Sequence, residues 1–327
     1  MTSLVEPNQH TDECTPEQAR QQIERLHANI ASVVLGKPEL IRLTLVALLA
    51  DGHLLLEDVP GLGKTLLARA LAASLDCSFH RIQFTPDLLP SDLLGTSIYQ
   101  MQKGEFVFQP GPLFAQVILA DEINRATPRT QSALLEAMSD RQVSIDGQTR
   151  PLGPPFIVLA TQNPFEFEGT YPLPESQLDR FLMRLSVGYP NRETERDILT
   201  QHRTGEPIDS VKPVLRAEDV LRLQRLVRQV AVAAPLVDYL LDIVHQTRTH
   251  AAIAFGASTR AALGFYRAVQ ALALVEGRMY AVPDDVKRLA KLVLAHRILT
   301  QQMRVGGIND SAAELIDEIV SQVAVPE

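Results

Sequence analysis

The sequence has few cysteines and no tryptophan, and the cysteine shortage excludes two classes of site. Its two cysteines, Cys14 and Cys77, are far apart and form no Cys-x-x-Cys pair. Closely spaced cysteine pairs are typical of zinc sites, and a set of several cysteines is typical of a disulfide framework. We therefore expect neither, and interpret both residues as reduced structural thiols.

Long apolar runs and an excess of basic residues are also missing. The longest uninterrupted apolar stretch is Leu45–Ala50, well short of the roughly 20 residues that a helix needs to cross a bilayer. The N-terminus carries acids and proline where a secretory signal would have basic residues before an apolar run. We therefore expect no membrane span and a cytoplasmic location. The net charge of -8 argues against a nucleic-acid partner, whose binding usually needs a basic face.

What the sequence does contain is the composition of a globular protein with two domains. Hydrophobic residues make up 46% of the chain and charged residues 21%, which are ordinary values. One hydrophobic core rarely serves 327 residues. We divide the chain into a flexible N-terminal tail with the start of the first helix (1–20), an α/β core (21–189) and an all-α lid domain (190–327).

The core region alternates apolar runs with helical patterns. His53–Glu57, Val117–Ala120 and Phe156–Ala160 are almost continuously apolar, as in parallel strands covered on both faces, while Phe79–Gln83 is a weaker, mixed strand. Helical spacing between these strands predicts a doubly wound parallel sheet. After Tyr189 the spacing is that of amphipathic helices, so we expect no strand in the lid.

Two segments interrupt this alternation with the pattern of β-hairpins. Ile98–Phe108 alternates apolar residues around a Lys-Gly pair, and Gln142–Thr149 contains an Asp-Gly turn. From the residues alone, surface decorations and functional insertions are equally good interpretations.

The strongest functional signal is a phosphate-binding loop between a predicted strand and a predicted helix. Residues 58–65 read DVPGLGKT, and the glycines let backbone N–H groups turn toward phosphate oxygens at a helix N-terminus. Lys64 is expected to reach the β- and γ-phosphates and Thr65 to bind Mg²⁺. The predicted cofactors are therefore ATP and Mg²⁺. Further predicted ATP-contacting residues are Asp58, Val59, Pro60, Gly61, Leu62, Gly63 and Leu66.

One position of this loop departs from the general pattern. Asp58 stands where glycine is usual, so we expect its carboxylate to face away from the phosphates. The alternative is a glycine-rich turn that binds nothing, but packing gives no reason for Gly-Lys-Thr at a helix start. A guanine-reading Asn-Lys-x-Asp segment is missing, which argues against a GTPase.

A second signal is the acidic pair Asp121 and Glu122 at the end of an apolar strand. In P-loop ATPases an Asp at this place helps to hold Mg²⁺, and a following Glu orients the attacking water. Two acids after a strand are otherwise typical of a helix N-cap. The upstream phosphate-binding loop favours the catalytic interpretation.

These motifs, with three more, resemble the MoxR family of AAA+ ATPases. The resemblance rests on residues 57–65 (EDVPGLGKT), 83–92 (QFTPDLLPSD), 120–126 (ADEINRA), 160–164 (ATQNP) and 173–181 (LPESQLDRF). They follow one another along the whole α/β core, and a weaker match lies near Arg260. The resemblance implies a P-loop core with a helical lid and ATP hydrolysis.

The resemblance also implies roles for residues that would otherwise have ordinary interpretations. Asn163 matches the sensor that contacts the γ-phosphate or the lytic water, although an Asn before Pro is usually a turn residue. Arg180 matches the arginine finger that reaches a neighbouring subunit's nucleotide; otherwise it would be a solvated arginine paired with a nearby acid. Arg260 matches the second sensor, and a cation at a helix N-terminus is locally unfavourable, which suggests a distant partner.

Two weaker assignments follow from the same resemblance. Leu35 and Gly36 occupy the place that lines the adenine pocket, where a plain helix break is the alternative. Gln83 would restrain Glu122 as a polar switch. The two hairpins match insertions that face a central pore or a client, which makes Tyr99 and Met101 contact candidates.

The function implied by the resemblance is ATP-driven remodelling by a ring. Subunits would form a homo-oligomeric ring, a hexamer, in which hydrolysis moves the lid against the core. The ring would mature or activate a protein client together with a von Willebrand A-domain partner. The alternatives are a nucleotide-gated binding module with little turnover, and an AAA+ nucleic-acid motor.

Overall fold

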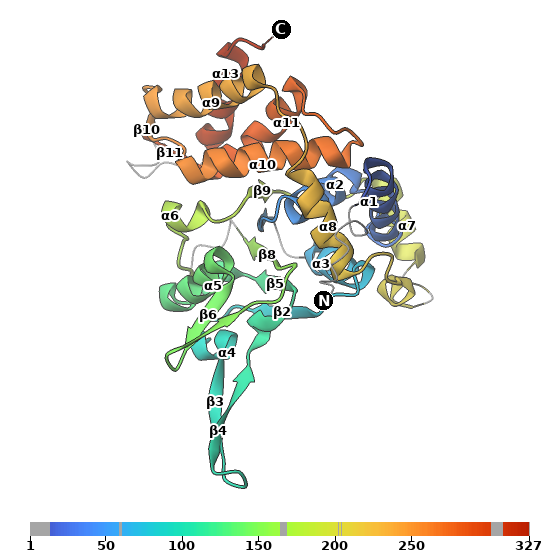
Figure 1. Cartoon of the computed structure of the whole chain (residues 1–327), viewed down its shortest axis with the longest axis vertical. Helices are drawn as coiled ribbons and strands as arrows, with labels where there is room; N and C mark the ends of the chain where they lie inside the picture. The colour runs from blue at the N-terminus through green and yellow to red at the C-terminus, as the bar shows by residue number, and fades with distance from the viewer. Residues whose placement is uncertain are drawn as a thin grey trace, which may run out of the picture.

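The computed structural model describes residues 14–58, 61–163, 169–201, 203, 205–301 and 310–326. The predicted tail up to residue 13 lies outside this part of the chain, and so do Val59 and Pro60 of the predicted phosphate-binding loop. The α/β core occupies the middle of the molecule, a helical lid lies at one end, and a long hairpin projects from the core at the other (Figure 1).

Five parallel strands form the central sheet in the order β2-β5-β8-β1-β9. They are β1 Leu54–Glu57, β2 Phe79–Gln83, β5 Val117–Asp121, β8 Ile157–Gln162 and β9 Met183–Leu185. The predicted doubly wound parallel sheet is confirmed. β2 lies at an edge, where only Ile82 of its five residues is buried, which accounts for its mixed composition.

The sheet divides its apolar side chains between two faces. Leu54, Leu119 and Leu159 join one hydrophobic cluster, whereas their neighbours Ile118 and Val158 join the other, because successive side chains of a strand point to opposite faces. The first cluster contains α1 Pro16–Ala31, α2 Pro38–Leu49 and α3 Lys64–Ser74. The second contains α4 Pro90–Leu94 and α5 Pro128–Asp140.

The helix α1 begins with a capping box. Thr15 is the N-cap, its hydroxyl accepts from the backbone N–H of Gln18, and the Gln18 side chain accepts from the N–H of Thr15. This reciprocal capping box satisfies two backbone donors at the helix start. Pro16 takes the first helical position, where its missing N–H costs nothing.

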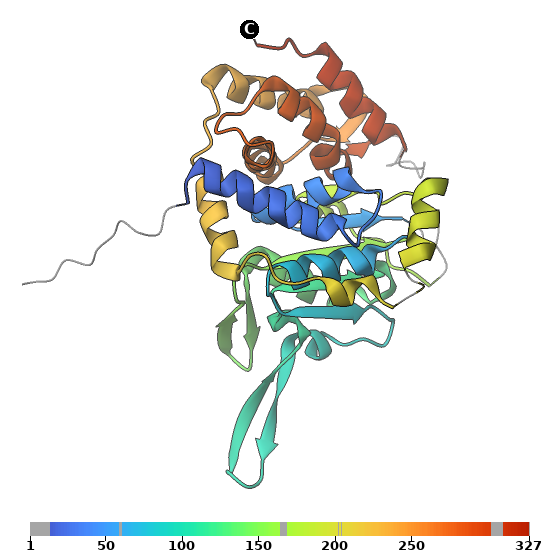
Figure 2. The ribbon, with the colours of Figure 1, turned by 90° about the vertical axis from the view of Figure 1, so that its right-hand side faces the viewer.

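Both predicted hairpins are present as antiparallel pairs. The longer one joins β3 Gly95–Gln100 to β4 Glu105–Pro110 and projects far from the sheet (Figures 1 and 2). The shorter one joins β6 Gln142–Ile145 to β7 Gln148–Pro151 through a turn in which Asp146 and Gly147 both have positive φ. The Ser97 hydroxyl donates to the Asp146 carboxylate over 2.6 Å, so the hairpins contact each other.

The lid is mainly helical, as predicted, but it also contains two short strands that the sequence analysis did not expect. β10 Ile253–Phe255 and β11 Leu299–Thr300 pair antiparallel. With three and two residues, neither can show the alternation by which strands are recognised. The longer helices after Tyr189 are α7 Arg192–Gln201, α8 Ala217–Val227, α9 Ala234–Thr249, α10 Thr259–Val275, α11 Pro283–Leu294 and α13 Asp310–Gln322. Short helices are α6 Glu175–Leu178, η1 Pro112–Phe114, η2 Ile123–Arg125, η3 Pro207–Ser210 and η4 Ala295–Arg297.

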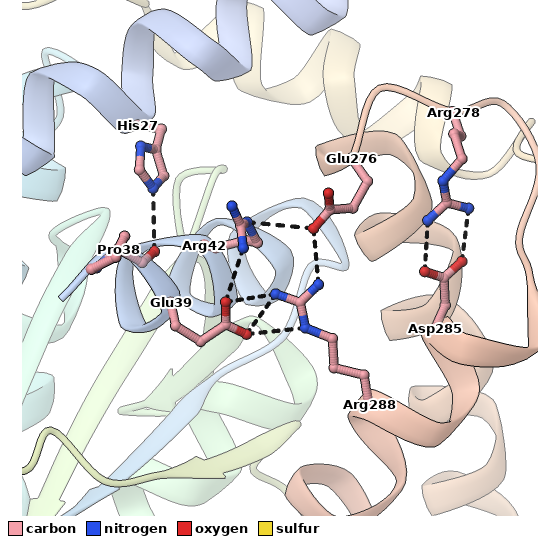
Figure 3. A network of polar contacts seen from close by, with 8 residues as sticks. All are labelled: His27, Pro38, Glu39, Arg42, Glu276, Arg278, Asp285 and Arg288. Atoms are coloured by element: carbon pink, nitrogen blue, oxygen red, sulfur yellow. Dashed lines mark hydrogen bonds and ion pairs between the residues drawn. The ribbon is translucent and has the colours of Figure 1, made fainter.

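The lid is anchored to the core through α1 and α2, which lie between the lid and the sheet (Figure 2). Side chains of the lid and of α1, α2 and α3 belong to one continuous hydrophobic cluster. At its edge, Arg288 of α11 contacts the Glu39 carboxylate of α2 at 2.6 Å and Glu276 at 2.9 Å. Arg42 bridges the same two carboxylates at 3.0 and 3.4 Å (Figure 3). The lid and the sheet therefore form one packed unit.

Two further findings concern the part of the chain that the structure describes. None of its helices is long and apolar enough to cross a membrane. Cys14 and Cys77 are both free thiols of intermediate exposure.

Candidate nucleotide-binding site

A cleft of about 940 Å³ lies at the carboxyl ends of β1, β5 and β8. Ligands of doubly wound sheets usually bind at this edge. The cleft brings together most of the residues predicted to bind nucleotide and metal: Leu35, Asp58, Gly61, Leu62, Gly63, Lys64, Thr65, Leu66, Asp121, Glu122 and Asn163. It also contains Arg81, Gln83 and Thr161.

The phosphate-binding loop leads directly into α3. Gly61 and Gly63 have φ values of 87° and 89°, and residues with a β-carbon rarely adopt such values. A β-carbon at either position would meet nothing within 4 Å, so the backbone conformation and not crowding requires glycine here. Gly63 is the N-cap of α3, and the free N–H groups of that helix start favour an anion.

Lys64 lies at the first position of α3 and is 8% exposed. Its ammonium donates to the backbone carbonyl of Asp58 over 2.7 Å. Burial lowers the pKa of Lys64, and the nearby carboxylates of Asp58, Asp121 and Glu122 oppose that change. The resulting buried cation is held beside the loop, where a phosphate would pair with it.

The carboxylate of Asp58 turns away from the loop, as expected from its charge. One of its oxygens accepts from the Ser186 hydroxyl at 2.8 Å and from the Gly188 backbone N–H at 2.6 Å. These bonds tie the loop to the segment that follows β9. An aspartate can therefore occupy the usual glycine position without directing its charge at a phosphate.

Asp121 ends β5 and is held from two sides. Its Oδ1 accepts from the Thr161 hydroxyl at 2.6 Å, and its Oδ2 accepts from the Arg81 guanidinium at 2.5 Å. The same Thr161 hydroxyl accepts from the N–H of Glu122 at 2.9 Å. Neither Thr161 nor Arg81 is a predicted site residue, although Thr161 belongs to the ATQNP motif.

Glu122 has a strained backbone and a restrained side chain. Its φ of 57° places it in the left-handed region, which costs a residue with a side chain about 1–3 kcal/mol, and such strained residues often occur at active sites. Its Oε2 accepts from the Gln83 amide at 2.8 Å and pairs with Arg125 at 3.0 Å. The contact with Gln83 is the one that the family resemblance implies for a switch residue.

Apolar side chains of the α1–α2 connection and of α7 form part of the lining of the cleft. They are Val33, Val34, Leu35, Ile198 and Leu199, and α7 also contributes the polar Glu195 and Gln201. Gly36 has a φ of 68°, and a β-carbon on it would come within 2.6 Å of the Thr194 side chain. Glycine at this position therefore lets the α1–α2 connection approach α7, so that side chains of both segments line the cleft, although Gly36 itself is not among the lining residues.

The two predicted arginines, Arg180 and Arg260, are not among the residues that line this cleft. Arg180 follows α6 and donates to the Leu135 carbonyl and, at 2.8 Å, to the Ser139 hydroxyl. Arg260 is exposed near the start of α10. The N-cap of that helix, Ser258, donates to Asp179 at 3.0 Å, so the two arginines lie on contacting segments.

The residues present fit a magnesium nucleotide. Thr65 and Asp121 supply oxygen ligands of the kind that Mg²⁺ prefers, and both line the cleft beside Lys64. Glycine-rich backbone, a buried lysine and apolar lining side chains provide the three environments that a nucleoside triphosphate needs.

Comparison with known proteins agrees with this site. Residues 53–183 match the model of the ATPase family associated with various cellular activities (AAA), and residues 245–319 match the AAA lid domain. The fold and the cleft thus define an AAA+ ATPase, an enzyme that hydrolyses ATP.

Whole-length relatives identify the family more narrowly. The chain is 44% identical to Chaperone MoxR1 of Mycobacterium tuberculosis, over 93% of this chain and 82% of that protein. It is 32% identical to Protein MoxR of Paracoccus denitrificans, over 91% of this chain and 95% of that protein. The chain belongs to the MoxR family of AAA+ ATPases. A crystal structure of a Cytophaga hutchinsonii protein, 40% identical, covers 95% of this chain and 97% of its own with a TM-score of 0.87.

Proposed function

We propose that this chain works as a homo-oligomeric ring, a hexamer, that hydrolyses ATP with Mg²⁺ at the contacts between subunits. The observation that carries this proposal is the separation of the site into two parts. The cleft holds Lys64 and Glu122, whereas Arg180 and Arg260 are not among its lining residues. A neighbouring subunit would have to supply those arginines to complete the site.

Within one cleft we assign each residue a separate task. Lys64 would pair with the β- and γ-phosphates, and Thr65 and Asp121 would hold Mg²⁺, which screens the phosphate charge when bound. Glu122 would orient and polarise the attacking water. Asn163 would contact the γ-phosphate or that water.

The restraint on Glu122 has a consequence for this cycle. While Gln83 and Arg125 hold its carboxylate, those contacts compete with its contact to a water molecule. We propose that release of Glu122 from Gln83 is part of activating each subunit. If Glu122 stayed bound to Gln83 and Arg125, the protein would bind ATP with little turnover. This is the alternative function, a nucleotide-gated binding module.

We further propose that hydrolysis drives the maturation or activation of a protein client in the cytoplasm. The relative named a chaperone supports this, and the family resemblance implies a von Willebrand A-domain partner. The longer hairpin supplies a contact surface, because Met101 is 89% exposed and Phe106 is 72% exposed. Exposed apolar side chains at the end of a projecting element are typical of interaction sites.

Because the lid shares its hydrophobic cluster with α1, α2 and α3, we place the moving contact between subunits. The resemblance implied instead that hydrolysis moves the lid against the core of the same subunit. We keep residues 21–189 as the core and 190–327 as the lid, and treat each subunit as a unit that rocks against its neighbours.

The test is multiple-turnover phosphate release by wild type and by Glu122→Gln. We expect steady turnover from wild type and a loss of about 10²- to 10⁴-fold in Glu122→Gln, with ATP still bound by calorimetry. Turnover of wild type no faster than that of Glu122→Gln would favour the nucleotide-gated module. A binding assay with single-stranded and duplex DNA across a salt series tests the nucleic-acid motor.

A further inference from the structure

The residues on either side of Arg180, Asp179 and Phe181, form hydrogen bonds and an ion pair with side chains of the lid. His296 donates through Nε2 to the carbonyl of Phe181 at 3.0 Å, and Arg297 donates to the same carbonyl. On the other side, Ser258 donates to Asp179 at 3.0 and 3.2 Å, and the Arg297 guanidinium lies 3.6 Å from that carboxylate. Both neighbours of Arg180 in the sequence are therefore bound by lid side chains.

We call this set of contacts, made by Ser258, His296 and Arg297 with Asp179 and Phe181, the clamp. Its central residue, Arg297, is a buried cation. The side chain of Arg297 is 3% exposed, and burial lowers its pKa to about 10, with Asp179 opposing the change and Arg260 adding to it. It remains protonated at neutral pH. Taking a guanidinium out of water costs several kcal/mol, and its Nε and Nη1 find no hydrogen-bond partner in the described residues.

An apolar side chain would fill such a site at lower cost. The buried guanidinium therefore needs a reason other than stability, and its contacts suggest one. Arg297 lies in η4 and pairs with Asp179, next to Arg180. Its guanidinium also lies beside Gly264 of α10, where an added β-carbon would come within 3.3 Å of Nη1, and α10 is the helix that carries Arg260. Ser258 completes this link, because it caps the helix of Arg260 by accepting from the Ala261 N–H at 3.0 Å while it donates to Asp179.

We propose that Arg297 and Asp179 are positioning residues for the two arginines that a subunit offers to its neighbour's nucleotide. The clamp fixes Arg180 and Arg260 relative to each other, so that both arrive together when the lid and core move as one unit. This inference rests on the proposed function, in which Arg180 acts on the neighbouring subunit.

Ring ATPase of Arg297→Met, which removes the charge and keeps similar volume, tests the proposal. A misplacement of about 1 Å in a catalytic group can cost about 10²-fold in rate, so we expect a loss of that order. ATP affinity should stay at the wild-type value, because Arg297 does not line the cleft. Arg297→Lys, which keeps the charge but not the fork of donors, should lose less.

Mixing separates positioning from a general structural role. Lys64→Ala subunits cannot bind ATP productively, but their Arg180 and Arg260 are still held by Arg297 and Asp179. In a mixed ring, an Arg297→Met subunit has an intact cleft, and a Lys64→Ala neighbour can supply correctly placed arginines to it. Such clefts should regain turnover. Arg180→Ala mixed in the same way is the reference. Arg278→Met, which removes a lid arginine paired with Asp285 at 2.6 Å, controls for weakening of the lid and should keep its ATPase.

Asp179→Asn is the second variant if Arg297→Met fails to fold, because the amide can still accept from Ser258. Loss in pure rings with recovery on mixing supports the proposal. Wild-type turnover in the pure variant rings, or a loss that mixing does not recover although Arg180→Ala is recovered, overturns it. If mixed rings form but Arg180→Ala is not recovered, the proposed action across subunits fails, and this inference fails with it.

Discussion

Replacing the buried histidine His53 should remove part of the loss of folding stability at acidic pH. His53 precedes β1, is 4% exposed, and links two elements: its Nδ1 accepts from the Val158 N–H at 3.0 Å, and its Nε2 donates to the Met138 carbonyl at 3.1 Å. Protonation of Nδ1 would break the bond to Val158. Burial is the main cause that lowers its pKa from 6.5 to about 4.

The size and sign of the effect follow from these two values. Below pH 6.5 the unfolded chain binds a proton at His53, whereas the folded chain does not until about pH 4. Unfolding therefore takes up protons in this window, and stability falls as the pH falls from 6.5 to 4. At about 1.4 kcal/mol per pH unit, the full loss is about 3 kcal/mol. His296, whose pKa burial also lowers, adds to the same trend.

The assay is urea unfolding at a series of pH values for wild type, His53→Asn and His245→Asn. The Asn oxygen can still accept from Val158 and does not titrate in this range, so His53→Asn should be less stable at pH 7 but lose about 3 kcal/mol less between pH 6.5 and 4. His245 is exposed, and its variant should follow wild type. An unchanged slope in His53→Asn would refute the reasoning.

Three other predictions concern the loop, the lid contact and the hairpin. Gly36→Ala should weaken ATP binding, because it adds about 1–2 kcal/mol of strain in the left-handed backbone conformation and a clash with Thr194 of α7. Gly153→Ala is the control, because Gly153 has open space around it, and this variant should bind ATP normally. Equal ATP affinities of the two variants by calorimetry would contradict the prediction. Arg288→Met should lower the free energy of unfolding by about 1 kcal/mol, since the side chains of Arg288, Glu39 and Glu276 are between about a third and a half exposed. Lys287→Met should lower it less, and a larger effect of Lys287→Met would argue against a stabilising role for this ion-pair network. Met101→Ser with Phe106→Ser should leave basal ATPase unchanged and reduce client capture by a Glu122→Gln ring, and undiminished capture would exclude the hairpin as the contact.

Sequence reasoning succeeded where a local pattern determines the structure. The strands β1, β5 and β8 have continuous apolar runs because both faces of the sheet are covered. The loop before α3 has glycines because its backbone needs positive φ. Both requirements determine the types of residues that are adjacent in the chain, so they can be recognised in a single sequence.

It failed where distant contacts decide. β9 forms only because Met183–Leu185 lie beside β1, with Leu54 opposite Met183, and three residues have no readable period. Thr161 matters because β8 places it next to Asp121. The location of Arg260 outside the lining of its own subunit's cleft depends on how the lid docks on α1 and α2, and no local pattern around Arg260 encodes that.

The most direct test of the whole account is an experimental structure of the Glu122→Gln protein assembled with ATP and Mg²⁺. We predict a ring in which each γ-phosphate contacts Lys64 of one subunit and Arg180 of the next, with Mg²⁺ between Thr65 and Asp121. ATP bound outside the cleft, or an Arg180 that reaches the nucleotide of its own subunit, would contradict it.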